Sequence, residues 1–414
     1  MPNTFTFVFL AALAAATATR LWLAARHLVH IQRHRGAVPA EFAGQISLEA
    51  HQKAADYSCA KTRFHDVALG VEVTLVLALT LGGGIEWLQQ HVAAWLPEGV
   101  GRGVALLASV VVLMSIADLP LSLYRTFRIE ARFGFNQMTL GLFVIDTIKT
   151  ALIAALFGLP LAALVLWLME RMGTAWWLYV WLTWVAFNLL VLTIYPRFIA
   201  PLFNKFSPLT DAELKERVES LLARCGFRSQ GLFVMDGSKR SSHGNAYFTG
   251  FGASKRIVFF DTLLSRLAPP EVEAVLAHEL GHFKLKHVLK RMAWMFSMSL
   301  GLLWLLGQLI RQPWFYHGLG VATPSTAAAL LLFSLALPAF SFLLQPLASH
   351  YSRKHEFEAD RYAAQHASAA DLVRALVKLY KDNAATLTPD PLHSAFYDSH
   401  PPAALRIARL QEST

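Results

Sequence analysis

Long apolar runs alternate with polar segments along the chain, and seven of these runs are long enough to cross a membrane as helices. Such a helix needs about 20 mostly apolar residues. The fifth, sixth and seventh runs contain no Asp, Glu, Lys or Arg and are the clearest predicted spans. The runs comprise residues 4–25, 67–87, 103–123, 140–169, 174–195, 292–309 and 325–349.

Two of the runs have special features. The first lacks the basic residues that open a cleaved signal peptide and continues past Arg20. It is therefore predicted to be a transmembrane helix, with cleavage near the alanines at 14–16 as the alternative. The fourth run is longer than one simple span, so we expect a kink near Pro160 or a stretch that lies along the membrane surface.

Basic residues between the runs predict the orientation, because Lys and Arg are enriched in cytoplasmic loops. The first loop carries Arg26, Arg33, Arg35, Lys53, Lys61 and Arg63, and the third carries Arg125, Arg128 and Arg132. The second, fourth and sixth loops carry only Arg102, Arg171 and Arg311, respectively. We therefore expect the N-terminus outside and the hydrophilic segments 196–291 and 350–414 on the cytoplasmic face.

Composition supports a membrane protein, since 55% of the residues are hydrophobic and only 16% are charged. Soluble domains are about a quarter charged. The formal net charge of +9 is explained by loops beside anionic lipid, so we expect membrane lipid as a partner and no nucleic acid. The predicted organisation is helices one to five in 1–195, a hydrophilic part in 196–291, helices six and seven in 292–349, and a second hydrophilic part in 350–414.

A helix predicted from Pro269 to Lys290 carries the pattern HExxH, formed by His278, Glu279 and His282. Positions i and i+4 share one face of a helix, so both imidazoles can reach one zinc ion. Glu279 follows directly and is positioned to act on a water molecule at the metal. The alternative is an amphipathic helix with incidental histidines.

A catalytic zinc site usually has three protein ligands. The extended motif HExxHxxGxxH is absent, because Leu285 and Val288 occupy the positions of its glycine and third histidine. A downstream carboxylate is the usual substitute. Glu356 and Asp360 are four residues apart on one face of a predicted helix, so Glu356 is the candidate ligand and Asp360 a hydrogen-bond partner of a ligand histidine. Spacing alone leaves Glu358 as a competing ligand.

Taken together, these motifs make the chain resemble the type I CAAX prenyl endopeptidases, integral-membrane zinc proteases with an HExxH helix and a later ExxxD helix. The resemblance covers nearly the whole chain. It is carried by residues 129–136 (IEARFGFN), 194–209 (IYPRFIAPLFNKFSPL), 236–251 (DGSKRSSHGNAYFTGF), 278–287 (HELGHFKLKH), 352–360 (SRKHEFEAD) and 398–401 (DSHP).

This resemblance implies a mainly α-helical membrane protein whose seven transmembrane helices enclose a chamber, with a small α/β zincin-like protease domain on the cytoplasmic side. It implies that Glu356 is the third ligand of one Zn²⁺ and that Asp360 is its partner on the helix. It also places two residues of the tail, His400 and Arg406, near the site. They are expected to donate to the oxyanion or to hold its neighbours, with an ordinary helix start after Pro401 as the alternative.

The expected mechanism uses zinc to polarise the scissile carbonyl and to acidify water, while Glu279 takes the proton and passes it to the leaving amine. Two strands are predicted at 247–250 and 256–260, joined by a turn at 252–254. Asn245, Ala246 and Tyr247 resemble the edge strand on which related zinc proteases pair the peptide substrate. The alternative for these residues is an ordinary hairpin.

The predicted function is a zinc-dependent metalloendopeptidase that cleaves after a prenylated cysteine near a substrate C-terminus. The alternative is a quality-control protease that acts on unprenylated membrane proteins. The expected location is a bacterial inner membrane, with the endoplasmic reticulum as the alternative. Charged residues within the runs fit a hydrated chamber, and Asp146 and Lys149 are expected to pair with each other. Oligomeric state and the substrate's entry path stay open.

Overall fold

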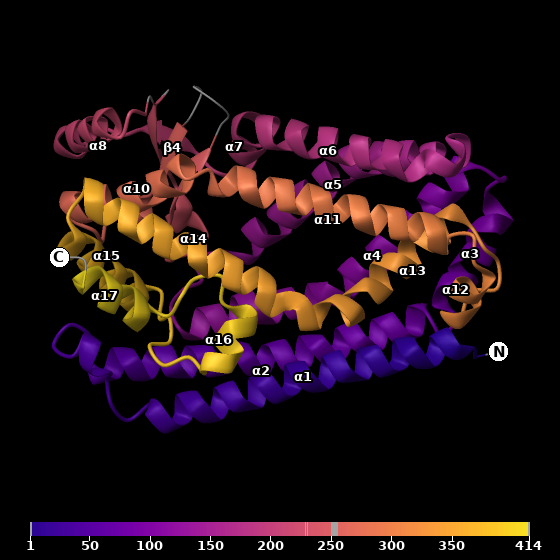
Figure 1. The fold of residues 1–414 in the computed structure, drawn as a ribbon, viewed down its shortest axis with the longest axis horizontal. Helices are drawn as coiled ribbons and strands as arrows, with labels where there is room; N and C mark the ends of the chain where they lie inside the picture. The colour runs from indigo at the N-terminus through magenta and orange to yellow at the C-terminus, as the bar shows by residue number, and fades with distance from the viewer. Residues whose placement is uncertain (1, 228, 230, 250–255, 413–414) are drawn as a thin grey trace.

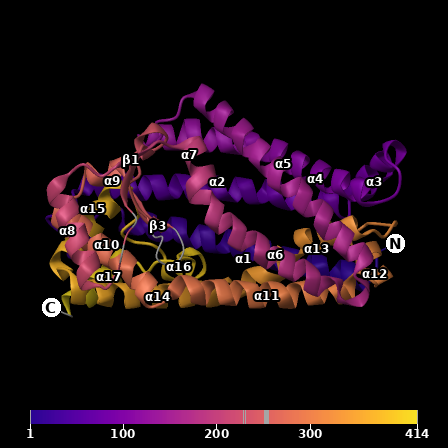
Figure 2. The same ribbon diagram turned by 90° about the horizontal axis from the view of Figure 1, so that it is seen from above.

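The computed structural model describes residues 2–227, 229, 231–249 and 256–412. Its long helices run side by side along the longest axis of the molecule, and a small sheet with its own helices lies at one end (Figure 1). The N-terminus and the short helix α12 lie at the opposite end, as the view from above also shows (Figure 2). The two hydrophilic segments of the sequence therefore meet at one end of a helical bundle.

Six helical stretches are long and apolar enough to cross a membrane, or seven if the bent pair α2 and α3 counts as one span. In the stretches that contain α6 and α11, only 6% of the apolar window is buried inside the protein, which leaves these faces available to lipid. The elements of this part are α1 (Thr4–His34), α2 (Leu48–Leu79), α3 (Gly84–Trp95), α4 (Val100–Tyr124) with a π-helical continuation (Arg125–Glu130), α5 (Leu140–Arg171), α6 (Trp176–Ile194), α7 (Ala200–Phe203), α11 (His287–Leu309), α12 (Pro313–Gly318), α13 (Thr326–Ser341) and α14 (Gln345–His366).

The second predicted span, at 67–87, is not one straight helix. The chain bends by 56° between α2 and α3, at three consecutive glycines. A Cβ atom on Gly82 or Gly84 would lie 2.7 or 2.8 Å from the carbonyl oxygen of Ala78, so only glycine permits this turn. Glu86, in the first turn of α3, accepts hydrogen bonds from the backbone of Ala322 and Thr323, which explains a carboxylate inside an apolar run.

The fourth apolar run forms a single helix, α5, which continues through Pro160. Its 32 residues are about 48 Å long, more than the hydrocarbon core of about 30 Å. The expected pairing of Asp146 with Lys149 is wrong. Asp146 accepts two hydrogen bonds from Arg240, at 2.7 and 3.0 Å, because the segment after the second strand packs against α5. Lys149 instead donates to the carbonyl oxygen of Leu202, at 2.7 Å.

The sheet has four short strands in the order β1-β2-β4-β3, with β3 at an edge. β1 and β3 are antiparallel to their neighbours, whereas β2 and β4 are parallel. The two strands predicted at 247–250 and 256–260 are confirmed as β3 and β4 over the residues that the structure describes. The turn predicted at 252–254 lies outside the described residues. The strands are β1 (Phe206–Pro208), β2 (Leu232–Met235), β3 (Ala246–Thr249) and β4 (Arg256–Phe260).

One hydrophobic core joins the sheet to helices of both hydrophilic segments. It contains Leu221 from α8, Phe259 from β4, Leu280 from α10 and Leu376 from α15, all at most 5% exposed. Asp211 caps the amphipathic helix α8 by accepting a hydrogen bond from the backbone of Leu214. The helices are α8 (Ala212–Arg224), α9 (Asp261–Leu264), α10 (Pro269–Lys284), α15 (Ala369–Asp382), α16 (Pro391–Tyr397) and α17 (Ala403–Gln411).

The helix with the HExxH motif is shorter than predicted. α10 ends at Lys284 rather than continuing to Lys290, because Lys286 adopts a left-handed backbone conformation with φ of 58°. α11 begins directly afterwards at His287. This break brings the side chain of His287 back toward the HExxH histidines.

Candidate metal centre and active site

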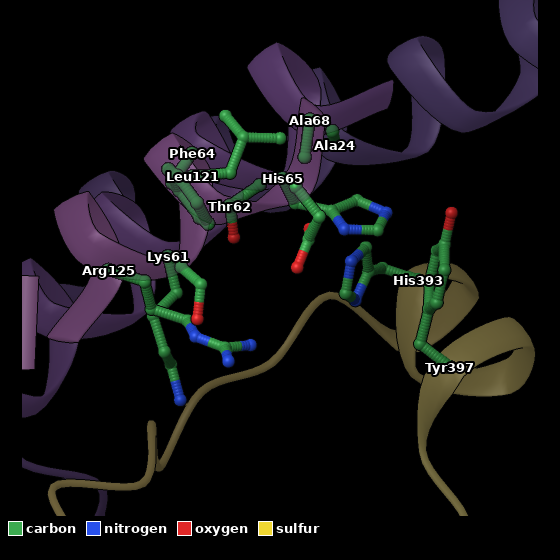
Figure 3. A pocket seen from close by; sticks show the side chains of 12 residues that line it. Ala24, Lys61, Thr62, Phe64, His65, Ala68, Leu121, Arg125, His393 and Tyr397 are labelled. Carbon is green, nitrogen blue, oxygen red and sulfur yellow. The ribbon is translucent and has the colours of Figure 1, made fainter. Parts of the chain in front are cut away.

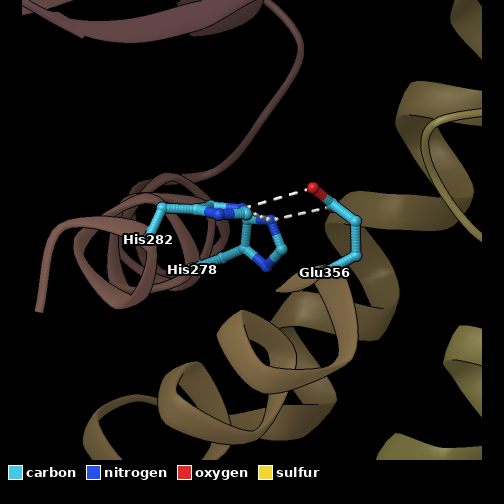
Figure 4. Close-up of side chains that lie close together, drawn as sticks. All are labelled: His278, His282 and Glu356. Atoms are coloured by element: carbon cyan, nitrogen blue, oxygen red, sulfur yellow. Dashed lines mark hydrogen bonds and ion pairs between the residues drawn. The ribbon is translucent and has the colours of Figure 1, made fainter. Parts of the chain in front are cut away.

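The two histidines of HExxH lie on the face of α10 that packs against α14. Close packing of these helices depends on Gly281, where a Cβ atom would lie 3.1 Å from the Cα atom of Ala359 and from the Cβ atom of Tyr362. α14 thereby presents the side chain of Glu356 to His278 and His282 (Figure 4).

The three side chains have the spacing of a metal centre. The Nε2 atoms of His278 and His282 lie 3.3 Å apart. The carboxylate oxygens of Glu356 lie 3.4 Å from Nε2 of His278 and 3.3 Å from Nε2 of His282. Ligand atoms about 2.0–2.1 Å from a tetrahedral ion are about 3.3–3.4 Å from one another. Glu358, the competing candidate, does not belong to this group.

Burial of Glu356 also fits a cation. The residue is 3% exposed, and its Oε2 atom has no hydrogen-bond partner among the described residues. A buried carboxylate oxygen without a partner is costly, and a bound cation would remove that cost. The donor set of two imidazoles and one carboxylate is typical of catalytic zinc sites.

His278 is oriented by a buried ion pair. Its Nδ1 atom lies 2.8 Å from a carboxylate oxygen of Asp360, and Arg406 donates two hydrogen bonds to the same carboxylate, at 2.6 and 2.8 Å. Because the carboxylate accepts the Nδ1 proton, the Nε2 lone pair faces Glu356 and His282. Burial alone would lower the pKa of His278, but the hydrogen bonds to Asp360 and Glu356 outweigh it and raise the pKa to about 9. The two carboxylates thus favour a positive charge at this position.

His282 is oriented by a second chain of hydrogen bonds, which the sequence analysis missed. Its Nδ1 atom lies 3.0 Å from Nδ1 of His287, and Nε2 of His287 lies 2.9 Å from a carboxylate oxygen of Glu358. Since a carboxylate can only accept, Nε2 of His287 carries a proton and its Nδ1 atom accepts from His282. This arrangement leaves Nε2 of His282 free to bind a metal. The ring of His355 stacks on His287 at 4.0 Å.

Glu279 lines a cavity of about 320 Å³ beside the three candidate ligands. Asn245 and Ala246, at the start of the edge strand β3, line the same cavity. Tyr247 does not, because it follows Ala246 within β3 and successive residues of a strand point to opposite faces. Its hydroxyl lies 3.9 Å from the sulfur of Met235, and burial raises its pKa to about 12.

The two candidate residues of the tail have different surroundings. The His400 side chain is 61% exposed, lines the same cavity as Glu279, and places Nε2 3.5 Å from an oxygen of Glu356. Arg406 is only 6% exposed and is held by its ion pair with Asp360. Its guanidinium also lies 3.9 Å from Glu356.

Two family models match successive parts of the chain. Residues 27–205 match the N-terminal part of CAAX prenyl proteases, described as five membrane helices, and residues 208–414 match peptidase family M48. The chain belongs to peptidase family M48. It is therefore a multi-pass membrane metalloendopeptidase that acts on peptide or protein substrates.

Relatives of this M48 peptidase align over most of their length. A CAAX prenyl protease 1 homolog from Arabidopsis thaliana is 37% identical over 89% of each chain. The homolog from Homo sapiens is 33% identical over 90% of this chain and 88% of its own. The crystal structure of S. mikatae Ste24p superimposes with a TM-score of 0.92 at 32% identity, covering 99% of this chain and all of that one. These matches confirm the expected fold class of a mainly helical membrane protease with six or seven apolar helices and a small sheet.

Proposed function

We propose that this M48 peptidase is a zinc endopeptidase of the CAAX type, which cleaves after a prenylated cysteine near the C-terminus of its substrate. The observation that carries the proposal is the group His278, His282 and Glu356 beside the cavity lined by Glu279. Relatives that carry the name CAAX prenyl protease 1 and align over about nine-tenths of the chain support the substrate class.

His278, His282 and Glu356 would hold the zinc ion. A bound zinc ion would act as a Lewis acid at the scissile carbonyl and would acidify a water molecule. Glu279 takes the proton of the attacking water and delivers it to the leaving amine, because its carboxylate lines the cavity directly beside His278.

Residues around the ligands position them and the substrate. Asp360 holds the Nδ1 proton of His278, and Arg406 fixes the carboxylate of Asp360. His400, exposed in the cavity, donates to the oxyanion that develops on the substrate. The free side of β3 receives the peptide as an added strand at Asn245 and Ala246, with Tyr247 contributing its backbone only.

We place the M48 part on the cytoplasmic side of the membrane, in contact with lipid at the ends of the helices. The excess of Lys and Arg in the first and third loops supports this orientation. A reporter fused to the C-terminus should be active in the cytoplasm, and activity on the outer face would contradict this orientation.

The function is tested with purified enzyme in detergent, a farnesylated CAAX peptide and its unprenylated counterpart. The enzyme should cleave after the farnesylated cysteine, and Glu279→Gln should lower turnover at least 100-fold while about one zinc ion stays bound per chain. Glu273→Gln is the matched control, because Glu273 also lies on α10 but pairs with Arg224 on α8. Retained turnover in Glu279→Gln would contradict the role of Glu279, and equal cleavage of both peptides would contradict the prenyl specificity.

A further inference from the structure

Three cavities of the protein share lining residues and together extend from the active site into the helical bundle. The cavity of Glu279 shares Tyr380, Ala385 and His400 with a second cavity of about 380 Å³, here called the middle cavity. The middle cavity in turn shares Lys61, Thr62, His393 and Tyr397 with a third cavity of about 400 Å³, the inner cavity (Figure 3). Both volumes are in the range of ligand pockets.

Two cationic side chains line the inner cavity. Lys61 projects from α2, and Arg125 projects from the end of α4. Figure 3 shows both side chains in the wall of the inner cavity, which α16 also lines with His393 and Tyr397. Both residues are exposed, and among the described residues neither has a carboxylate within 4.0 Å. The ammonium group of Lys61 makes a cation–π contact with the Tyr57 ring, with Nζ 4.2 Å from the ring centroid.

These cations are not balanced by the rest of the cavity wall. Asp118 is the acidic residue of the lining, against Lys61, Arg125 and two histidines. A cavity wall that carries charges of mainly one sign attracts ligands of the opposite charge. The inner cavity therefore has a surplus of positive charge with room for an anion.

We propose that Lys61 and Arg125 bind the C-terminal carboxylate of the peptide substrate. This inference rests on the proposed cleavage near a C-terminus, which leaves three residues beyond the scissile bond. Three extended residues span about 10–11 Å. The middle cavity has His400, next to Glu356, in its wall together with Lys61, so it connects the reacting bond with the cations.

The same cations would also suit the phosphate of a lipid headgroup. A peptide carboxylate is favoured because the cavity that they line continues into the active site and is bordered by His393 and Tyr397 of α16. Charge-assisted hydrogen bonds from Lys and Arg are about twice as strong as neutral ones, so a carboxylate fixes the peptide end and its register. The fixed position of the peptide's C-terminus then determines that the bond three residues from this end lies at the active site.

The test compares two farnesylated CAAX peptides that differ only at the C-terminus, one with a free carboxylate and one with a carboxamide. For the wild-type enzyme, kcat/KM should be about 10- to 100-fold higher for the free acid. The ratio should fall toward one in Lys61→Met and in Arg125→Gln. Arg63→Gln is the matched control, because Arg63 lies two residues along α2 from Lys61 and outside the lining of all three cavities. It should keep the wild-type ratio.

Equal cleavage of the two peptides by the wild-type enzyme would overturn the carboxylate site while leaving the proposed function intact. Failure to cleave either peptide, in enzyme that holds zinc, would overturn the proposed function itself. If Lys61→Met and Arg125→Gln slow both peptides equally, and added anionic phospholipid changes the wild-type rate but not theirs, the cations bind lipid and the inference is wrong. Zinc content near one per chain in each variant shows that the fold is retained.

Discussion

Replacing His287 by Leu tests whether the second chain of hydrogen bonds prepares His282 for metal binding. His287 is 1% exposed and lies between His282 and Glu358, with contacts of 3.0 and 2.9 Å. Leucine has a similar volume but no acceptor. The substitution thus leaves the Nδ1 proton of His282 without its partner and allows the imidazole to adopt the other tautomer.

Two estimates give the size of the effect. Losing a hydrogen-bond partner of a metal-binding histidine typically lowers metal affinity by about 10–100-fold, which is about 1.4–2.7 kcal/mol. Leaving a largely buried polar group unsatisfied costs about 1–3 kcal/mol, and the His282 side chain is only 14% exposed. We therefore expect the dissociation constant for zinc to increase by about 10–100-fold.

Affinity is measured by competition with a chromophoric chelator, in detergent, on enzyme stripped of metal. His355→Phe is the matched control, since His355 stacks on His287 at 4.0 Å but does not contact the candidate ligands through a hydrogen bond. A phenyl ring keeps the stacking, so the zinc affinity should stay within about threefold of the wild type. Wild-type affinity in His287→Leu would refute the argument that this chain of hydrogen bonds sets the tautomer of His282.

Three further predictions concern charged side chains that are buried or partly buried. Arg406→Leu leaves Asp360 buried without its partner and should lower the free energy of unfolding by about 3–5 kcal/mol, an effect that an unchanged denaturation midpoint would exclude. In metal-free enzyme, His278 has its pKa raised to about 9, so its stabilisation is complete below about pH 6.5 and is lost as the pH rises to about 9. Thermal midpoints measured from pH 6 to 10 should therefore fall, and a flat profile would contradict this. Asp146→Arg and Arg240→Asp should each destabilise the enzyme, whereas the double variant should recover much of the loss; additive losses would show that the two residues do not interact.

Features encoded by local sequence were predictable. The apolar runs predicted membrane spans because a bilayer requires apolar segments of about this length. Six of the seven runs form continuous helical stretches. The spacing of HExxH places His278 and His282 on one face of α10 whatever that helix packs against. β3 also forms where the alternation of residues predicted a strand, and it lies at the sheet edge.

Features that depend on contacts between distant segments were not predictable. Asp146 and Arg240 are 94 residues apart, so the nearer Lys149 was the more obvious partner. The break between α10 and α11 depends on Lys286, which adopts a left-handed backbone conformation although lysine does not favour it, so the sequence does not indicate the break.

The bend between α2 and α3 could have been predicted from the glycines at 82–84, because three consecutive glycines disfavour an uninterrupted helix.

The choice between Glu356 and Glu358 shows why orientation had to come from the structure. Residues two apart on a helix point about 200° away from each other, so only one of the two glutamates can face α10. α14 turns Glu356 toward the HExxH histidines, and the bend after α10 brings His287 to Glu358 on another side of the same helix. Asp360, one turn after Glu356, returns to the first side and reaches His278. Slightly more than one turn of α14 thus carries the candidate ligand and both carboxylates that orient the histidines. A change of register in this helix would remove all three from the site at once.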